Sequence, residues 1–127
     1  MICLFEKYSE RINNHYLQFT HCKIRNPIKK NILGKTKLKY KINFKQKDSI
    51  YIHKNDFNKI VTNILNCDVY HPNGSVSSID CFGINYYTKE KTIQIYNELV
   101  KKQIDENLLS FLRENIDKYN GFYILGI

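Results

Sequence analysis

Residues 35–47 alternate between lysine and other side chains over almost their whole length. Side chains along a β-strand point to opposite faces with a period of two, so this pattern predicts a strand. One face of that strand is expected to be apolar and to carry Leu38, Tyr40, Ile42 and Phe44. The other face is expected to present lysines spaced about 7 Å apart. These lysines are Lys35, Lys37, Lys39, Lys41, Lys45 and Lys47.

A row of lysines has two interpretations. Proteins place lysine on exposed strands to prevent pairing with other chains, in which case the row only faces water. Alternatively, the row binds an acidic partner. Residues 1–60 hold 14 Lys and Arg against 4 Asp and Glu, whereas residues 61–127 hold 6 against 8. A one-sided positive field accelerates association with anionic partners, so binding is expected in the N-terminal half.

The length and the cysteine pattern restrict the class of protein. A chain of this length is expected to form a single domain, residues 1–127, around one core. Its cysteines, Cys3, Cys22, Cys67 and Cys81, form no CxxC pair, which is typical of reduced thiols. We find no targeting segment and no apolar run near the 18 or so residues of a membrane span. A cytoplasmic protein is therefore expected.

Local patterns predict the elements before residue 70. A helix is expected over the first twenty residues, where apolar side chains recur at helical intervals, although residues 15–24 also fit a strand. Residues 25–34 are expected to form a basic loop. The strand at 35–47 is expected to form an antiparallel hairpin with residues 50–52. The apolar positions of the first segment are Phe5, Tyr8, Ile12 and Tyr16.

The clearest helix is expected to begin at Asn55 or Asp56, either of which can cap it. Its apolar side chains recur at positions i, i+3, i+4, i+7 and i+8, so they share one face. They are Phe57, Ile60, Val61, Ile64 and Leu65.

Beyond residue 70 the residues that favour turns and helix caps are more distinctive. Residues 71–75 contain Pro72 and Asn73-Gly74, which predict a turn. Residues 76–87 are expected to form a strand. Two capped helices follow, one after Thr88 and one after Asp105. The inward side chains are expected to be Ile93, Tyr96, Leu99 and Val100 in the first helix, and Leu108, Leu109, Leu112, Ile116 and Tyr119 in the second.

The end of the chain is almost wholly apolar. Asn120-Gly121 is expected to close the second helix in a left-handed conformation. Residues 122–127 have no polar face, which is typical of a strand buried on both sides of a sheet. Together the patterns predict an α+β fold in which a mixed or antiparallel sheet of about four to five strands packs with three to four helices.

Residues suited to catalysis or metal binding are few. The glycines form neither a P-loop nor a dinucleotide-binding motif. One alternative is a zinc site formed by Cys67, His71 and Cys81. Another is a small hydrolase in which Asp80 acts as a base with a histidine such as His53 or His71. We expect neither, and we expect no cofactor, no metal and no enzymatic activity.

Two segments carry a resemblance to a known group of proteins. Asp80-Cys-Phe-Gly-Ile-Asn-Tyr-Tyr and the closing Asn120-Gly-Phe-Tyr-Ile-Leu-Gly-Ile resemble small bacterial immunity proteins of contact-dependent growth inhibition and related polymorphic toxin systems. The resemblance covers about the last fifty residues. It implies a compact cytosolic α+β inhibitor that binds one cognate toxin domain and has no turnover of its own. It transfers no binding residue to this chain.

The leading hypothesis is therefore a non-catalytic immunity protein that binds a cognate toxin domain. Lysines would provide fast and specific association, while tyrosine and apolar contacts would provide most of the lasting affinity. The residues expected to bind the partner are Lys35, Lys37, Lys39, Lys41, Lys45, Tyr40, Tyr51 and His53.

The alternative hypothesis is a small basic nucleic-acid-binding module. In that case the lysines would neutralise phosphates, and Tyr40, Phe44 or Tyr51 would stack on bases. A strand at 35–47 argues against it, because the aromatic side chains would lie on the face opposite the lysines.

Overall fold

The computed structural model describes residues 4–60, 65, 67–102 and 105–126. Within these residues, seven strands form one antiparallel sheet in the order β1-β5-β2-β9-β8-β6-β7, and β3 and β4 form a separate hairpin. The strands are β1 (Glu6–Lys7), β2 (Tyr16–His21), β3 (Ile28–Lys30), β4 (Thr36–Leu38), β5 (Ile50–His53), β6 (Val69–Tyr70), β7 (Val76–Ser77), β8 (Ile84–Tyr87) and β9 (Phe122–Gly126). The helices are α1 (Lys54–Ile60), α2 (Lys89–Lys102) and α3 (Glu106–Lys118).

The α+β class and the antiparallel sheet are confirmed, but the described residues contain more strands than the four to five predicted. Part of the excess comes from residues 76–87, which form two strands rather than one. A turn at Asp80–Gly83 separates β7 from β8, and in it the Asp80 carboxylate accepts a hydrogen bond from the Phe82 amide at 2.9 Å. The rest comes from short strands that lack a strong local signal.

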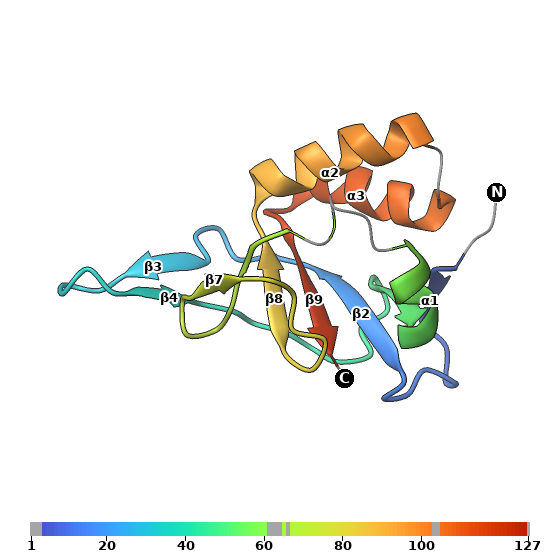
Figure 1. Ribbon diagram of the computed structural model, residues 1–127, viewed down its shortest axis with the longest axis horizontal. Coiled ribbons are helices and arrows are strands. Elements are labelled where there is room, and N and C mark those ends of the chain that lie inside the picture. Colours follow the sequence, from blue (N-terminus) through green and yellow to red (C-terminus); the bar gives the residue numbers. More distant parts are fainter. Residues whose placement is uncertain (1–3, 61–64, 66, 103–104, 127) are drawn as a thin grey trace.

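The main core lies between the sheet and the helices, and Figure 1 shows α2 and α3 side by side over the sheet. β9 lies between β2 and β8, and every residue from Phe122 to Leu125 is buried. The Phe122 ring stacks on Tyr87 at 4.6 Å between centroids and on Phe19 at 5.7 Å. The prediction of a terminal strand buried on both sides is therefore confirmed.

The caps of α2 and α3 are confirmed. The Thr88 hydroxyl accepts a hydrogen bond from the Lys91 amide at 3.2 Å, and the Asp105 carboxylate accepts one from the Leu108 amide at 3.1 Å. The predicted face of α2 is wrong in part, because Ile93 and Val100 are exposed. Leu99 is buried and Tyr96 is half-buried against the core, as predicted, while the other buried positions are Thr92 and Ile95 rather than Ile93 and Val100.

In α3 the buried side chains are Leu108, Phe111, Leu112 and Asn115, while Leu109 and Ile116 are half-buried. Tyr119 is the C-cap residue. The left-handed Gly121 that follows, with φ of 81°, agrees with the prediction.

The predicted helix over the first twenty residues is wrong. β1 pairs with β5, and β2 pairs with both β5 and β9. Strand pairing satisfies the backbone groups of β2 on both sides, and this long-range gain outweighs a local helical spacing. The alternative of a strand within residues 15–24 is the correct one.

The predicted helix at residues 55–65 begins earlier than expected, at Lys54, so neither Asn55 nor Asp56 is its cap. The buried Phe57 and Leu65 belong to the main core as predicted. The other apolar positions predicted for this helix, Val61 and Ile64, lie outside the described residues, as does the side chain of Ile60.

The predicted strand at 35–47 is wrong beyond its first few residues. β4 ends at Leu38, and it pairs with β3 rather than with residues 50–52. β3 itself lies within residues 25–34, which were expected to form only a loop. Residues 39–47, here called the crossing segment, contain no strand and run beneath the sheet on the side away from α2 and α3 (Figure 1).

The crossing segment helps to cover the second face of the sheet. A smaller apolar cluster on that face contains Cys22, Leu38, Tyr86, Tyr123 and Leu125, with Ile42 packed against it. The buried Gln18 side chain holds the segment in place. Its amide nitrogen donates to the Asn43 carbonyl at 3.0 Å, and its amide oxygen accepts from the Lys45 amide at 3.0 Å.

We expect the Gln18→Leu variant to lose about 2 kcal/mol of unfolding free energy. The change keeps the side-chain volume but leaves backbone groups of Asn43 and Lys45 without their partner, and such groups cost about 1–3 kcal/mol each where they are buried. Chemical denaturation measures the loss, and hydrogen exchange measures the protection of the Lys45 amide. Thr20→Val, on the same face of the same strand, controls for a polar-to-apolar change. Unchanged Lys45 protection in Gln18→Leu would show that Gln18 does not hold the segment.

Candidate protein-binding surface

The β3-β4 hairpin with its turn, residues 28–38, forms an arm that projects from the body of the protein (Figure 1). We call it the basic arm. Its base is fixed by two backbone hydrogen bonds, from the Lys39 amide to the Pro27 carbonyl at 2.6 Å and from the Leu38 amide to the Pro72 carbonyl at 3.3 Å. The buried Leu38 side chain anchors it further in the second-face cluster. The body of the protein therefore sets the direction of the arm.

The tip of the basic arm is a well-defined turn that carries two apolar side chains. The Asn31 side-chain oxygen accepts hydrogen bonds from the amides of Leu33 at 3.0 Å and Lys35 at 2.9 Å. Gly34 takes a φ of 76°, which favours glycine. Between them, Ile32 is fully exposed and Leu33 is 78% exposed. Two large aliphatic side chains are thus presented to solvent on a fixed backbone.

The predicted lysines are all exposed, but they do not form a single row. Lys35 and Lys37 lie on the basic arm, where Lys37 is opposite Lys29 in the strand register. Lys39, Lys41 and Lys45 lie on the crossing segment, and Lys45 has a φ of 58°. The chain therefore distributes these charges over two segments, rather than along one strand face.

The crossing segment also exposes two aromatic side chains that were predicted to share an apolar strand face with Leu38. Tyr40 is 44% exposed and Phe44 is 57% exposed. Only Leu38 is buried, and Ile42 is half-buried. Because the segment is not a strand beyond Leu38, its lysines and its aromatic side chains do not separate onto opposite faces, and both reach the surface. Lysines and aromatic rings are consequently neighbours along the same stretch of exposed chain.

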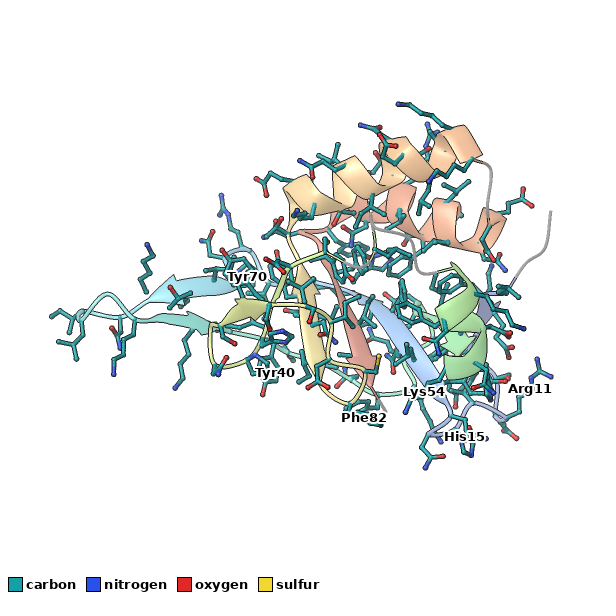
Figure 2. All side chains as sticks on the ribbon, in the orientation of Figure 1. Arg11, His15, Tyr40, Lys54, Tyr70 and Phe82 are labelled. Carbon is teal, nitrogen blue, oxygen red and sulfur yellow. The ribbon has the colours of Figure 1, made fainter. Side chains whose placement is uncertain are left out.

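Phe82 adds a further exposed ring that sequence reasoning missed. It sits in the turn between β7 and β8 and is 84% exposed. The Lys54 ammonium lies 5.2 Å from the centroid of its ring, a cation–π distance. Figure 2 shows Tyr40, Phe82 and Lys54 along the edge of the molecule opposite α2 and α3. The Asp80-x-x-Gly83 pattern, typical of a turn, is the sequence signal that could have placed Phe82 at the surface.

An open cavity of about 870 Å³ lies between these segments. Phe44 lines it from the crossing segment, and Phe82 lines it from the turn after β7. The predicted turn at 71–75 is confirmed by the hydrogen bond from the Gly74 amide to the His71 carbonyl at 2.8 Å, and this turn forms another wall. Two exposed aromatic rings therefore border one hollow on the surface.

Two other residues predicted to bind a partner are less exposed than the lysines. Tyr51 is fully buried, its hydroxyl donates to the Gln46 carbonyl at 2.7 Å, and burial raises its pKa to about 12. It is a core residue in this structure and not part of the surface. His53 is half-buried, accepts a hydrogen bond from the Asn55 amide at 3.2 Å, and stacks on His15 at 6.1 Å between ring centroids.

The groups considered for catalysis or zinc binding make structural contacts. The Asp80 carboxylate accepts the Phe82 amide, and the His71 ring nitrogens lie 3.1 Å from the Ser78 carbonyl oxygen and 3.4 Å from that of Ile84. Among the described residues, no three His, Cys, Asp or Glu side chains are placed to hold a metal ion. Cys67, His71 and Cys81 therefore do not form the zinc site considered above.

Comparisons with protein-family models, with curated proteins and with solved structures gave no match. Within the described part of the chain, none of the helices has the length and apolar character needed to cross a bilayer.

Proposed function

We propose that this protein is a non-catalytic immunity protein that binds and neutralises a cognate bacterial toxin domain in the cytoplasm. The observation that carries the proposal is the exposure of large apolar side chains among lysines. Soluble proteins expose few large apolar patches, and those that they do expose commonly bind other proteins. The exposed side chains in question are Ile32, Leu33, Tyr40, Phe44 and Phe82.

Charge and apolar area have complementary roles in this proposal. Residues 25–47 contain eight lysines and one arginine and no Asp or Glu, so the surface favours a partner with an acidic face. The aromatic rings of Phe44 and Phe82 supply the desolvated contact area from which interfaces gain most of their affinity. The resemblance of residues 80–87 and 120–127 to immunity proteins agrees with a toxin domain as that partner. The free thiols of Cys22, Cys67 and Cys81 are compatible with the cytoplasm.

A growth-protection experiment tests the proposal. The product of the gene adjacent to that of this chain is taken as the candidate toxin domain and is expressed in a sensitive bacterium, with or without the chain. We expect the wild-type protein to restore growth. We expect the Phe44→Ser/Phe82→Ser variant to bind the domain about 1000-fold more weakly, because each ring is expected to contribute about 2 kcal/mol.

Ile93→Ser/Val100→Ser is the matched control, because it removes two exposed apolar side chains from α2, on the far side of the molecule. The control should protect as well as the wild type. Absence of protection and of binding by the wild-type protein would overturn the proposal.

A second candidate function is nucleic-acid binding, and one observation favours it. Tyr40 and Phe44 are exposed on the same segment as Lys39, Lys41 and Lys45. The objection drawn from an alternating strand therefore does not apply. Binding to random oligonucleotides with a steep logarithmic dependence on salt would support this function, and no binding at about 50 mM salt would exclude it.

A further inference from the structure

We infer that the basic arm inserts into an acidic cleft of the toxin domain. In this arrangement Ile32 and Leu33 at the tip contact the apolar floor of the cleft. Lys29 and Lys37 pair with carboxylates at the rim of the cleft. The inference rests on the proposed function and specifies the chemistry of the partner. It concerns one part of the surface, so it can fail while the proposed function holds.

The charge of the basic arm is uncompensated within the described residues. Lys29 and Lys37 are direct neighbours across the β3-β4 register, and like charges placed opposite each other destabilise a hairpin. None of the ion pairs formed by the described residues includes a lysine of the arm. A carboxylate placed between the two ammonium groups would relieve their repulsion. The arm therefore matches a negatively charged rim.

The tip provides the second requirement. Fully exposed aliphatic side chains gain free energy when they enter an apolar pocket, at roughly 25 cal/mol per Å² of apolar surface removed from water. Ile32 and Leu33 lie in the turn between β3 and β4, and this turn forms the far end of the arm in Figure 1. A partner that satisfied only the lysines would leave both side chains in water. The complementary surface is therefore a cleft with an apolar floor and an acidic rim.

The rigidity of the basic arm makes insertion favourable. The Asn31 side chain fixes the turn, and the hydrogen bond of Lys39 to Pro27 fixes the base. A preformed hairpin loses little conformational entropy on binding, which lowers the cost of association. Because Ile32 and Leu33 are exposed, substitutions there are expected to leave the rest of the fold intact.

An acidic protein fits these observations better than a nucleic acid. Phosphates would pair with the lysines, but single-stranded nucleic acids are bound mainly through stacking on aromatic rings. The tip carries aliphatic side chains, and the aromatic rings of this surface lie outside the arm, at Tyr40, Phe44 and Phe82. Nucleic-acid binding is therefore the competing outcome of the test.

The test measures binding kinetics between the full chain and the candidate toxin domain, the product of the adjacent gene. We expect Lys29→Glu/Lys37→Glu to slow association at least about 10-fold at low salt, with a smaller effect at high salt, because rim charges act mainly on the association rate. We expect Ile32→Ser/Leu33→Ser to speed dissociation about 100-fold with little change in association. Lys101→Glu/Lys102→Glu on α2 is the matched control for net charge and should bind like the wild type.

Three results would overturn the inference. The first is wild-type kinetics for both arm variants while the wild-type chain still binds and protects, which leaves the proposed function intact. The second is equal slowing by the α2 control, which would show that only net charge matters. The third is loss of the interaction after nuclease treatment. Circular dichroism of each variant confirms that the fold is retained. If the wild-type chain itself does not bind the toxin domain, the proposed function fails and the inference fails with it.

Discussion

Replacing Asp105 by alanine is expected to lower the free energy of unfolding by about 4 kcal/mol. The Asp105 side chain is 1% exposed and joins two distant parts of the chain. One carboxylate oxygen caps α3 through the Leu108 amide at 3.1 Å. The other accepts the amides of Leu4 at 2.7 Å and Phe5 at 3.3 Å. Loss of the carboxylate leaves these donors without an acceptor and releases the buried Phe5 from the end of the helix.

Urea denaturation near neutral pH measures this loss. Asp105→Asn is the informative control, because one amide oxygen can serve either the α3 cap or the N-terminal segment but not both. We expect it to lose about half as much stability as Asp105→Ala. Hydrogen exchange at the amides of Phe5 and Leu108 shows which contact survives. A loss below about 1 kcal/mol in Asp105→Ala would show that the two contacts contribute little.

Acid is expected to destabilise this protein through His21. Burial holds the pKa of the His21 imidazole at about 4, below its ordinary value of 6.5. The ring is stacked between Phe111 at 4.1 Å and Tyr119 at 4.4 Å. Its Nδ1 accepts a hydrogen bond from the Asn115 amide nitrogen at 2.9 Å, and that nitrogen also donates to the Gly121 carbonyl at 2.6 Å. Protonation would place an N–H against this donor, so the neutral ring is favoured.

The direction of the pH effect follows from the depressed pKa. Unfolded His21 takes up a proton near pH 6.5 and folded His21 only near pH 4, so the unfolded state binds more protons between these values. The contribution of neutral His21 to the free energy of unfolding is fully present above pH 6.5. It falls as the pH drops from 6.5 to 4, and below pH 4 there is no further loss. The total loss is about 3 kcal/mol, since one pKa unit corresponds to about 1.4 kcal/mol.

His21→Phe isolates this effect from other titrating groups. The variant keeps an aromatic ring between Phe111 and Tyr119 but has no proton to bind. The stability difference between wild type and variant should therefore change by about 3 kcal/mol between pH 7 and pH 4, as measured by denaturation at each pH. A difference that is constant across this range would contradict the assignment to His21.

Several elements could be predicted from the sequence because their signals are local. The Asp105 cap requires an acceptor three residues before the amide that it satisfies, and the turn at 71–75 requires glycine at a left-handed position. The burial of β9 follows from a continuous apolar run at residues 122–126, which leaves no face for water. The exposure of the lysines between 29 and 47 follows from the cost of removing unpaired charge from water.

The candidate surface was predicted only in part. The concentration of positive charge in residues 25–47 was visible in the sequence. The exposed tip at Ile32 and Leu33 was not, because large aliphatic side chains are normally signals for the core. Phe82 was also missed, and Tyr51 was assigned to the surface although it is buried.

The sequence by itself determined the helices α2 and α3, the buried final strand and the excess of lysine in the N-terminal half. Only the tertiary structure decided the path of residues 35–47. Their period of two fits a strand, but a strand requires a partner whose backbone groups are free. β5 already pairs with β1 and β2, and β3 pairs with β4 alone. The buried side-chain amide of Gln18 instead forms hydrogen bonds with the backbone of Asn43 and Lys45. These contacts join residues far apart in the chain, and no local pattern encodes which distant groups remain unpaired.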